Sequence, residues 1–398
     1  MTREVPRRRA WAALAVLALA AFAYVTTELL PIGLLTLIAT DLGRSRSQIG
    51  LLVSGYAFVV VLASVPLTQM TRRVSRRRLL GATLILFAVA NAAGALATTY
   101  EILAVSRLVT ALTQALFWSI ASPAVTGLFP VAMRGRVVSL FSTGAALAPV
   151  AGVPVGTWLG QQAGWRAAFL AMGVAGLVIT AAVVALIPSA PADSGSAATG
   201  TAPDRRHFML LLVATAAGVC GFLTFNTYVT PFLLDVSRFG DGALAPLLFV
   251  SGAAGIAGAI GIGRILDRRP ILSLLAPLTV GAGSLAGLYA LGALKPATVV
   301  LLAGVGLSYS AFATAVQSRM LQVAPGRTDL ASAGVGTAFN VGIAAGSLLG
   351  GALLPGLGSR PLALTGAVLT VAAFVVLVVD SRDRTVTPQD PGCRQPAT

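Results

Sequence analysis

Twelve runs of predominantly apolar residues follow one another along this chain of 398 residues, and they constrain the fold more than any other feature. A helix needs about 20 such residues to cross the hydrocarbon core of a bilayer. Charged residues are only 10% of the chain, whereas soluble domains average about 25%. The sequence therefore predicts an all-α membrane protein, with no room for a separate catalytic domain. The spans are expected near residues 11–38, 49–70, 79–99, 101–125, 137–160, 167–187, 208–233, 243–265, 271–293, 297–321, 330–355 and 362–379.

A polar stretch divides the twelve runs into two sets of six. Residues 188–207 are rich in Ser, Ala, Gly, Pro and Asp, a composition typical of an exposed flexible linker. We expect an N-terminal six-helix bundle over residues 1–187 and a C-terminal six-helix bundle over residues 208–380. A short tail over residues 381–398 would follow the second bundle.

The start of the chain allows a second interpretation. Arg7, Arg8 and Arg9 precede an apolar run in which Ala21 to Ala23 resemble a signal-peptidase site. The apolar run continues to Leu37, which is too long for a typical signal sequence, and cleavage would leave an odd number of spans. We therefore expect the first run to be retained as a membrane span.

The basic residues predict the orientation. Cytoplasmic loops of membrane proteins are enriched in Lys and Arg. With the N-terminus inside, twenty basic residues fall on the cytoplasmic side and six fall outside. The split predicts a multi-pass protein of the cytoplasmic membrane with both termini in the cytoplasm. The six residues expected outside are Arg44, Arg46, Arg166, Arg238, Lys295 and Arg360.

Several other functional classes have little support. The net charge of +15 comes from scattered loops and not from a basic groove with stacking aromatics, so we expect no nucleic-acid partner. Cys220 and Cys393 lie far apart, and His207 is the single histidine, which leaves too few ligands for a zinc site. The chain has neither a nucleotide-binding loop nor a G-x-S-x-G nucleophile motif. We expect no enzyme activity, cofactor or metal, and a monomer.

The two halves repeat one another at an offset near 195 residues. Gly152, Gly156 and Gly160 in the fifth span correspond to Gly346, Gly350 and Gly351 in the eleventh. After the eighth span comes G-x-x-x-D-R, formed by Gly263, Asp267 and Arg268, while its counterpart after the second span has Thr68 and Arg72 in place of the Gly and the Asp. Repeated six-span units are one plan on which transporters are built.

With these motifs, the chain resembles the major facilitator superfamily over essentially its whole length, which implies two pseudo-symmetric six-helix bundles. The antiporter signature G-x8-G-x3-G-P-x2-G-G is similar to Gly135, Gly144, Ala148, Pro149, Gly152 and Val153, with two departures. Leu103 and Arg107 match the start of the fourth-span motif, and Thr110 and Ala111 replace its glutamine-glycine pair.

Local strings resemble the bacterial sugar efflux transporters, within the twelve-span drug:proton antiporter branch. The matching strings are T-T-E-L-L-P-I-G-L-L from Thr26 to Leu35, F-W-S-I from Phe117 to Ile120, G-W-R from Gly164 to Arg166 and F-N-V-G-I from Phe339 to Ile343. The resemblance implies proton-driven export of small molecules, with sugars and glycosides as the named class. Chloramphenicol-type drug efflux shares much of the same pattern and remains an alternative.

Glu28 is the acidic residue that lies well inside a predicted span. An ionised carboxylate in hydrocarbon costs at least a few kcal/mol, so such a group faces a cavity, pairs with a cation or holds a proton. Arg107, in the fourth span, is the natural partner, and we hypothesise that it holds Glu28 ionised until a proton or substrate arrives. Two alternatives stay open: a position of Glu28 at the mouth of a cavity without a coupling role, and an Arg107 that snorkels outward or supports helix packing.

Polar and aromatic residues inside apolar runs nominate a face for substrate. Amides can pair with sugar hydroxyls while aromatic rings stack on apolar faces, although helix-to-helix hydrogen bonding or interfacial anchoring is an equal alternative for each residue. The predicted substrate contacts are Tyr24, Glu28, Gln114, Phe117, Trp118, Asn226, Tyr228, Tyr309, Gln317 and Asn340.

A further set of residues is predicted to serve gating. Asp and Arg of the loop motif can latch the ends of helices in one state, while glycines and Pro149 can let the fifth span bend as the halves rock. Close helix packing alone also explains the glycines. The predicted gating residues are Gly263, Asp267, Arg268, Gly144, Pro149 and Gly152.

These observations predict a small-molecule exporter that exchanges substrate for protons across the bilayer by alternating access. Its partners would be a sugar or a drug, protons and lipid. A membrane scaffold or sensor that does not transport is a remote alternative.

Overall fold

The computed structural model describes residues 6–71, 74–130, 133–187, 203–266, 268–325 and 328–386. These residues are α-helical and contain no strand. Twelve helices are long and apolar enough to cross a membrane, and the predicted all-α fold with twelve spans is confirmed. The described residues of the linker begin at Pro203, so the stretch 188–202 lies outside them.

Within the described residues, the first bundle contains six spans built from nine helical segments. They are α1 (Arg7–Gly33), α2 (Leu35–Asp41), α3 (Arg46–Thr71), α4 (Arg76–Ala95), α5 (Tyr100–Thr126), α6 (Arg134–Leu147), η2 (Ala148–Gly152), α7 (Val153–Ala163) and α8 (Trp165–Leu186). The first span is interrupted at Leu34, and the fifth is formed by α6, η2 and α7 in series.

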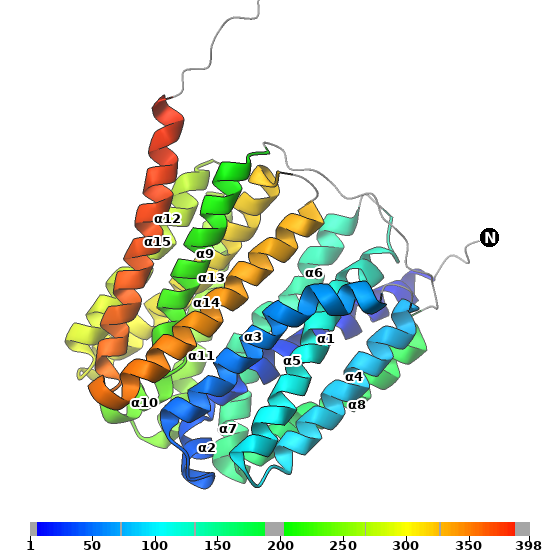
Figure 1. The fold of residues 1–398 in the computed structure, drawn as a ribbon, viewed down its shortest axis with the longest axis horizontal. Helices are drawn as coiled ribbons and strands as arrows, with labels where there is room; N and C mark the ends of the chain where they lie inside the picture. The colour runs from blue at the N-terminus through cyan, green and yellow to red at the C-terminus, as the bar shows by residue number, and fades with distance from the viewer. Residues whose placement is uncertain are drawn as a thin grey trace, which may run out of the picture.

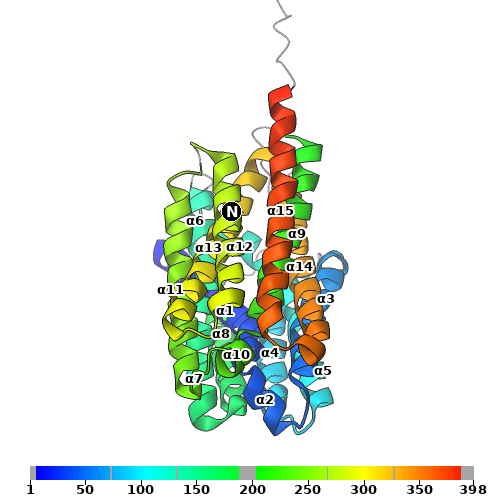
Figure 2. The ribbon, with the colours of Figure 1, turned by 90° about the vertical axis from the view of Figure 1, so that its left-hand side faces the viewer.

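The second bundle has the same order of six spans, but its fifth span is one continuous helix. Its segments are α9 (Arg205–Asn226), α10 (Val229–Asp235), η3 (Asp241–Ala243), α11 (Leu244–Gly263), α12 (Pro270–Leu291), α13 (Lys295–Val323), α14 (Thr328–Leu357) and α15 (Arg360–Val386). The interruption between α9 and α10 corresponds to the one between α1 and α2. Helix α15 ends at Val386, beyond the predicted boundary at residue 380, and extends past its neighbours (Figure 2).

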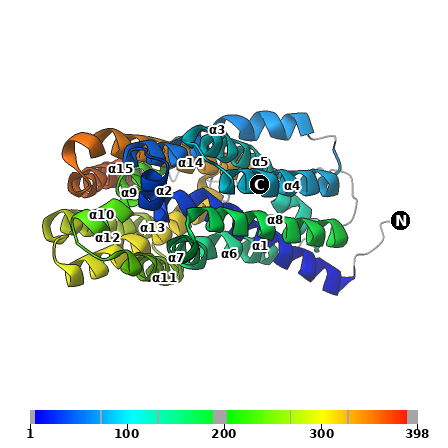
Figure 3. The same ribbon diagram turned by 90° about the horizontal axis from the view of Figure 1, so that it is seen from below.

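The two bundles lie side by side and meet at one end of the molecule. Helices α2 and α10 contact each other there, and Figure 3 shows α2 where the two bundles meet. Toward the opposite end, where α1 and α9 begin, the helices of the two bundles lean apart (Figure 1). We call the first end the closed end and the other the linker end.

Contacts between the bundles follow the internal symmetry. Helix α3 packs on α14, and α11 packs on α7 and η2. These are the second span with the eleventh and the fifth with the eighth, which are pairs related by the repeat.

At the closed end, the last loop of each bundle has the same arrangement of a glycine followed two residues later by an arginine. Gly164 and Gly358 have φ angles of +84° and +75°, a left-handed conformation that favours glycine. Two residues later, Arg166 donates to the carbonyl of Ala97 at 2.8 Å, and Arg360 donates to the carbonyl of Tyr289 at 2.7 Å. Arg166 therefore satisfies a carbonyl just beyond α4, and Arg360 satisfies one in the last turn of α12.

Glycines in the fifth span allow close contact with α1. A Cβ on Gly144 or Gly152 would lie closer than 3.0 Å to the Ala18 carbonyl or the Thr26 hydroxyl. Between these glycines, η2 is a π-helix that includes Pro149, a type of bulge that accommodates irregular hydrogen bonding. Close packing therefore accounts for Gly144 and Gly152. The backbone hydrogen bonding of the fifth span is irregular around Pro149.

Candidate functional site

Two charged side chains are buried where α1 and α5 cross. Glu28 lies on α1 with 8% of its surface exposed, and Arg107 lies on α5 with 1% exposed. Burying an unpaired charge is costly, so both groups require polar partners. The sequence prediction brought these two residues together, and the structure places them in neighbouring positions.

Arg107 binds the backbone of α1. Its Nη1 donates to the carbonyl of Thr27 at 2.6 Å, and its Nη2 donates to the carbonyl of Glu28 at 3.0 Å. Pro31 lies inside α1 and has no N–H to offer the carbonyl of Thr27, four residues earlier. Arg107 therefore supplies the hydrogen bond that Pro31 cannot make.

The carboxylate of Glu28 has a different partner. Its Oε2 accepts a hydrogen bond of 2.7 Å from Nε2 of Gln114, one of the predicted substrate contacts. Gln114 in turn accepts a 2.7 Å hydrogen bond at Oε1 from the hydroxyl of Tyr56 on α3. These three side chains form a continuous chain across three helices.

We call Glu28, Tyr56, Arg107 and Gln114 the buried polar cluster. The ring of Tyr56 also covers the guanidinium of Arg107, at 4.5 Å from the ring centroid. The hypothesis that Arg107 pairs directly with the Glu28 carboxylate therefore needs revision for this conformation, because the arginine is engaged by two carbonyls and an aromatic ring. The carboxylate has one amide donor, which suits a group that gains and loses a proton.

Tyr56 was missed in the sequence. A tyrosine in the middle of an apolar run is a signal, but its partner depends on the register between α3 and α5, which spacing along one helix does not supply. Its side chain is fully buried.

Two predicted substrate contacts lie in the core of the first bundle. Tyr24 is fully buried, and its ring lies 4.6 Å from that of Phe117 and 4.5 Å from that of Phe87. Phe117 is also fully buried. Trp118 is half-buried and packs against Phe141 at 5.7 Å, so of these predicted aromatics it has surface left for a ligand.

In the second bundle, the predicted contact Tyr309 lies toward the buried polar cluster. It is half-buried on α13, packs against Phe222 at 5.5 Å and lies within electrostatic range of Glu28. Asn226 is half-buried at the end of α9, and Gln317 is exposed on α13. Asn340 donates from Nδ2 to the carbonyl of Gly336 on its own helix, at 3.0 Å.

Tyr228 lies at the closed end, away from the position expected for a substrate contact. It is fully buried at the interruption between α9 and α10, and its hydroxyl donates to the carbonyl of Ser347 at 3.1 Å. The same hydroxyl lies against Gly50 of α3, where a Cβ would be closer than 3.0 Å. Tyr228 therefore fills the contact between the bundles.

Polar contacts around Tyr228 join the bundles. Arg46 forms an ion pair with Asp235, and Ser47 donates to the carbonyl of Gly351. We call this set of contacts the clasp. It also includes the hydrogen bonds from Thr230 to the carbonyl of Ile32 at 2.6 Å and from Ser347 to the carbonyl of Gly50 at 2.9 Å.

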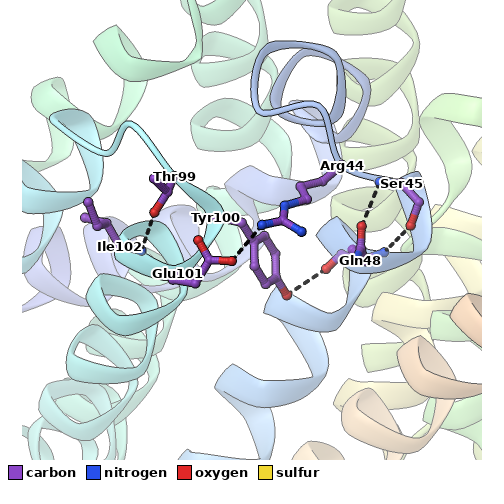
Figure 4. A network of polar contacts seen from close by, with 7 residues as sticks. All are labelled: Arg44, Ser45, Gln48, Thr99, Tyr100, Glu101 and Ile102. Atoms are coloured by element: carbon purple, nitrogen blue, oxygen red, sulfur yellow. Dashed lines mark hydrogen bonds and ion pairs between the residues drawn. The ribbon is translucent and has the colours of Figure 1, made fainter.

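The residues next to the clasp bind within the first bundle (Figure 4). Arg44 forms an ion pair of 2.7 Å with Glu101, and the hydroxyl of Tyr100 donates to the carbonyl of Gln48 at 2.9 Å. Ser45 and Gln48 form reciprocal hydrogen bonds at the start of α3, as in a capping box. These bonds fix the first turn of α3 to α5.

A third ion pair supports the closed end. Asp41 accepts hydrogen bonds from Nε1 of Trp165 at 3.1 Å and from Nη1 of Arg166 at 2.6 Å. Partial burial of the carboxyl opposes its ionisation, but these two donors and the positive charge of Arg166 keep the pKa of Asp41 below its usual value. Asp41 therefore ties the end of α2 to α8 in its ionised form.

The predicted gating motif lies at the linker end. Gly263 ends α11 and Arg268 is exposed, while Asp267 lies outside the described residues. Within the described part of the chain, no three His, Cys, Asp or Glu side chains are grouped to hold a metal ion.

Comparison with known proteins identifies the family. The model of the Major Facilitator Superfamily matches residues 16–329. The chain belongs to this superfamily. A member named probable sugar efflux transporter, from Mannheimia succiniciproducens, is 31% identical over 381 residues, which are 95% of this chain and 96% of that protein. As a superfamily member, the chain is a multi-pass membrane transporter and not an enzyme.

Solved structures of superfamily members share the fold. A bacterial homologue of the human lysosomal transporter Spinster, in an inward-facing and unoccupied conformation, aligns with a TM-score of 0.73 and 16% identity, over 97% of this chain and 100% of that one. The human organic anion transporter MFSD10 aligns with a TM-score of 0.67 and 15% identity, over 94% of this chain and 99% of that one.

Proposed function

We propose that this transporter exports small polar molecules, sugars or glycosides, in exchange for protons, and that Glu28 carries the proton. The observation that carries the proposal is the buried Glu28 carboxylate, which has one amide donor from Gln114. An ionised carboxylate in a dry environment is unfavourable, whereas water or a substrate hydroxyl stabilises it. Opening and closing of the site would therefore change its affinity for a proton.

The clasp would close the extracellular side. The linker end carries Arg205 and Arg206 at the start of α9 and Arg264 after α11, and arginine-rich loops favour the cytoplasm. In this orientation, the conformation described is inward-facing, as in the Spinster homologue. Alternating access then requires the clasp contacts to break while the linker ends approach.

A sugar is the favoured substrate class. The related protein is named a probable sugar efflux transporter. Trp118 and Tyr309, which are half-buried, supply aromatic faces for stacking, and Gln317 and Asn340 supply amides for hydroxyl groups. The same groups suit an amphipathic drug, so chloramphenicol-type efflux is the second candidate.

The cycle follows from these positions. Glu28 would take up a proton on the acidic side, the protonated and drier state would pass to the inward-facing form, and the proton would leave to the cytoplasm when substrate and water enter. Arg107 would keep its hydrogen bonds to α1 and set the electrostatic field at the carboxylate. Each turn would export substrate at the expense of the proton gradient.

Uptake into inverted vesicles tests this proposal. Labelled sugars, a thiogalactoside and chloramphenicol are offered to wild type and to Glu28→Gln with an inward-acid gradient. Sugar uptake that requires the gradient and is lost in Glu28→Gln supports the proposal. Uptake of chloramphenicol alone would favour drug efflux, and sugar uptake unaffected by the substitution would contradict the role of Glu28.

A further inference from the structure

Gln114 has a single way to satisfy both of its neighbours when Glu28 is ionised. A carboxylate accepts hydrogen bonds and cannot donate one, so Gln114 must present its NH2 group to Glu28. Its carbonyl oxygen then faces Tyr56, which must donate its hydroxyl proton. The structure has this arrangement, with both hydrogen bonds at 2.7 Å.

Protonation of Glu28 removes this restriction. A carboxylic acid can donate as well as accept. The amide of Gln114 can then turn over, accept from Glu28 and donate to the oxygen of Tyr56. The ionised state therefore fixes one orientation of Gln114 and Tyr56, and the protonated state permits two.

Several charged and titratable groups surround Glu28, and Gln114 is the partner whose orientation can change. Arg107, from α5, is held by the carbonyls of α1 and by the ring of Tyr56. Tyr309 of α13 lies within electrostatic range, and Tyr24, on α1 itself, directs its hydroxyl to the carbonyl of Thr83 at 3.4 Å. Gln114 joins the Glu28 carboxylate to Tyr56 of α3 through hydrogen bonds.

Helix α3 also forms part of the clasp. Gly50 precedes Tyr56 by six residues, about 9 Å along a helix, and accepts at its carbonyl from Ser347 of the other bundle. Ser47, one turn earlier, donates to Gly351. A change in the constraint on Tyr56 therefore acts on the helix that holds the bundles together.

We propose that Gln114 and Tyr56 form a relay that reads the protonation state of Glu28 and transmits it to α3 at the clasp. The ionised carboxylate fixes one arrangement of α1, α5 and α3 through the two hydrogen bonds, and protonation permits a second. Tyr56 is a positioning residue in this relay, because it acts on Glu28 through Gln114. The inference rests on the proposed role of Glu28 as the proton carrier.

The test follows the conformation of the protein as a function of pH. Spin labels are placed at the closed end on either side of the clasp, by Thr40→Cys and Gly242→Cys in a background with Cys220→Ser and Cys393→Ser. Both sites are exposed. Double electron–electron resonance in lipid nanodiscs then gives the fraction of molecules with the clasp open at each pH, and the pH midpoint of that change.

Tyr56→Phe and Gln114→Met are the informative variants, and Tyr24→Phe is the matched control. Tyr56→Phe keeps the ring over Arg107 but releases the amide, so the midpoint moves to higher pH by about half to one unit. Gln114→Met removes a hydrogen bond to a charged group directly and moves it by about 1–2 units. Tyr24→Phe removes the hydroxyl of another buried tyrosine on α1 and leaves the midpoint in place.

The outcomes separate this inference from the proposed function. If Glu28→Gln abolishes the pH dependence while Tyr56→Phe has the wild-type midpoint, the relay is wrong and the proton carrier stands. If wild type shows no pH dependence, or Glu28→Gln retains it, both proposals fail. A midpoint that moves equally in Tyr24→Phe also overturns the relay, because the effect would then be unspecific loss of a buried hydroxyl.

Discussion

Two arginines in one turn of the chain allow a matched test of the clasp. Arg46 pairs with Asp235 across the bundles, whereas Arg44 pairs with Glu101 within the first bundle. Both arginine side chains are similarly exposed, at 38% and 39%. Reversing the charge of Arg46 should therefore favour the conformation in which the clasp is open, and reversing that of Arg44 should not.

The expected size follows from the exposure of the pair. Solvent screens ion pairs of this kind, which contribute about 0.2–1 kcal/mol. Charge reversal replaces the attraction by a repulsion of similar size, so Arg46→Glu should shift the balance by about 0.4–2 kcal/mol. The ratio of open to closed clasp would then rise about 2–30-fold.

The assay is the label distance between Thr40→Cys and Gly242→Cys, measured at low salt, where surface ion pairs are strongest. We expect Arg46→Glu to enrich the long distance, and the double variant Arg46→Glu with Asp235→Arg to restore the wild-type distribution. An equal shift in Arg44→Glu, or a double variant that stays open, would refute the assignment of the clasp.

Three further predictions concern the helices around the two sites. Gly50→Ala should open the clasp more strongly than Arg46→Glu in the same distance measurement, because its Cβ would collide with the hydroxyl of Tyr228; an unchanged distribution would show that the contact adapts. Pro31→Ala supplies the missing N–H to α1. The loss of stability caused by Arg107→Ala should therefore be smaller by about 1 kcal/mol in the Pro31→Ala background. Strictly additive effects of the two substitutions would count against the role of Arg107 as the hydrogen-bond donor that replaces the N–H. Asp41→Asn should lower thermal stability at pH 7. The pKa of Asp41 is depressed in the folded state. The contribution of Asp41 to stability is therefore complete above its unfolded pKa of about 3.9 and is lost as the pH falls through its folded pKa. The difference between Asp41→Asn and wild type should therefore narrow below about pH 4, and a constant difference would contradict this.

The sequence predicted the features that depend on one helix at a time. Apolar length defined the twelve spans, and the spacing of Gly152 and Gly156 predicted close packing, since both are set by the local periodicity of a helix. Glu28 and Arg107 were also expected to lie together, because buried charges are rare enough to require partners, whereas Gln114 was predicted as a substrate contact and not as the partner of Glu28.

Features that depend on how helices face one another were not predictable in the same way. Tyr24 and Glu28 are four residues apart and share a helix face, yet Tyr24 packs between Phe87 and Phe117. At the level of Tyr24, helix α1 is surrounded by helices of the first bundle. The last turns of α1 are the part that approaches the second bundle. Tyr228 was predicted as a substrate contact, but it contacts α3 and α14 at the closed end. These partners are far away in sequence, so the pattern along one helix did not reveal them.

The central claim is that Glu28 couples transport to the proton, and the most direct test separates exchange from accumulation. Purified wild type and Glu28→Gln are reconstituted in proteoliposomes, and labelled substrate is followed both in counterflow without a gradient and in accumulation driven by a pH gradient. We predict that Glu28→Gln retains counterflow, because the neutral side chain still accepts and donates hydrogen bonds, and that it loses gradient-driven accumulation. Accumulation at the wild-type level in Glu28→Gln would contradict the account.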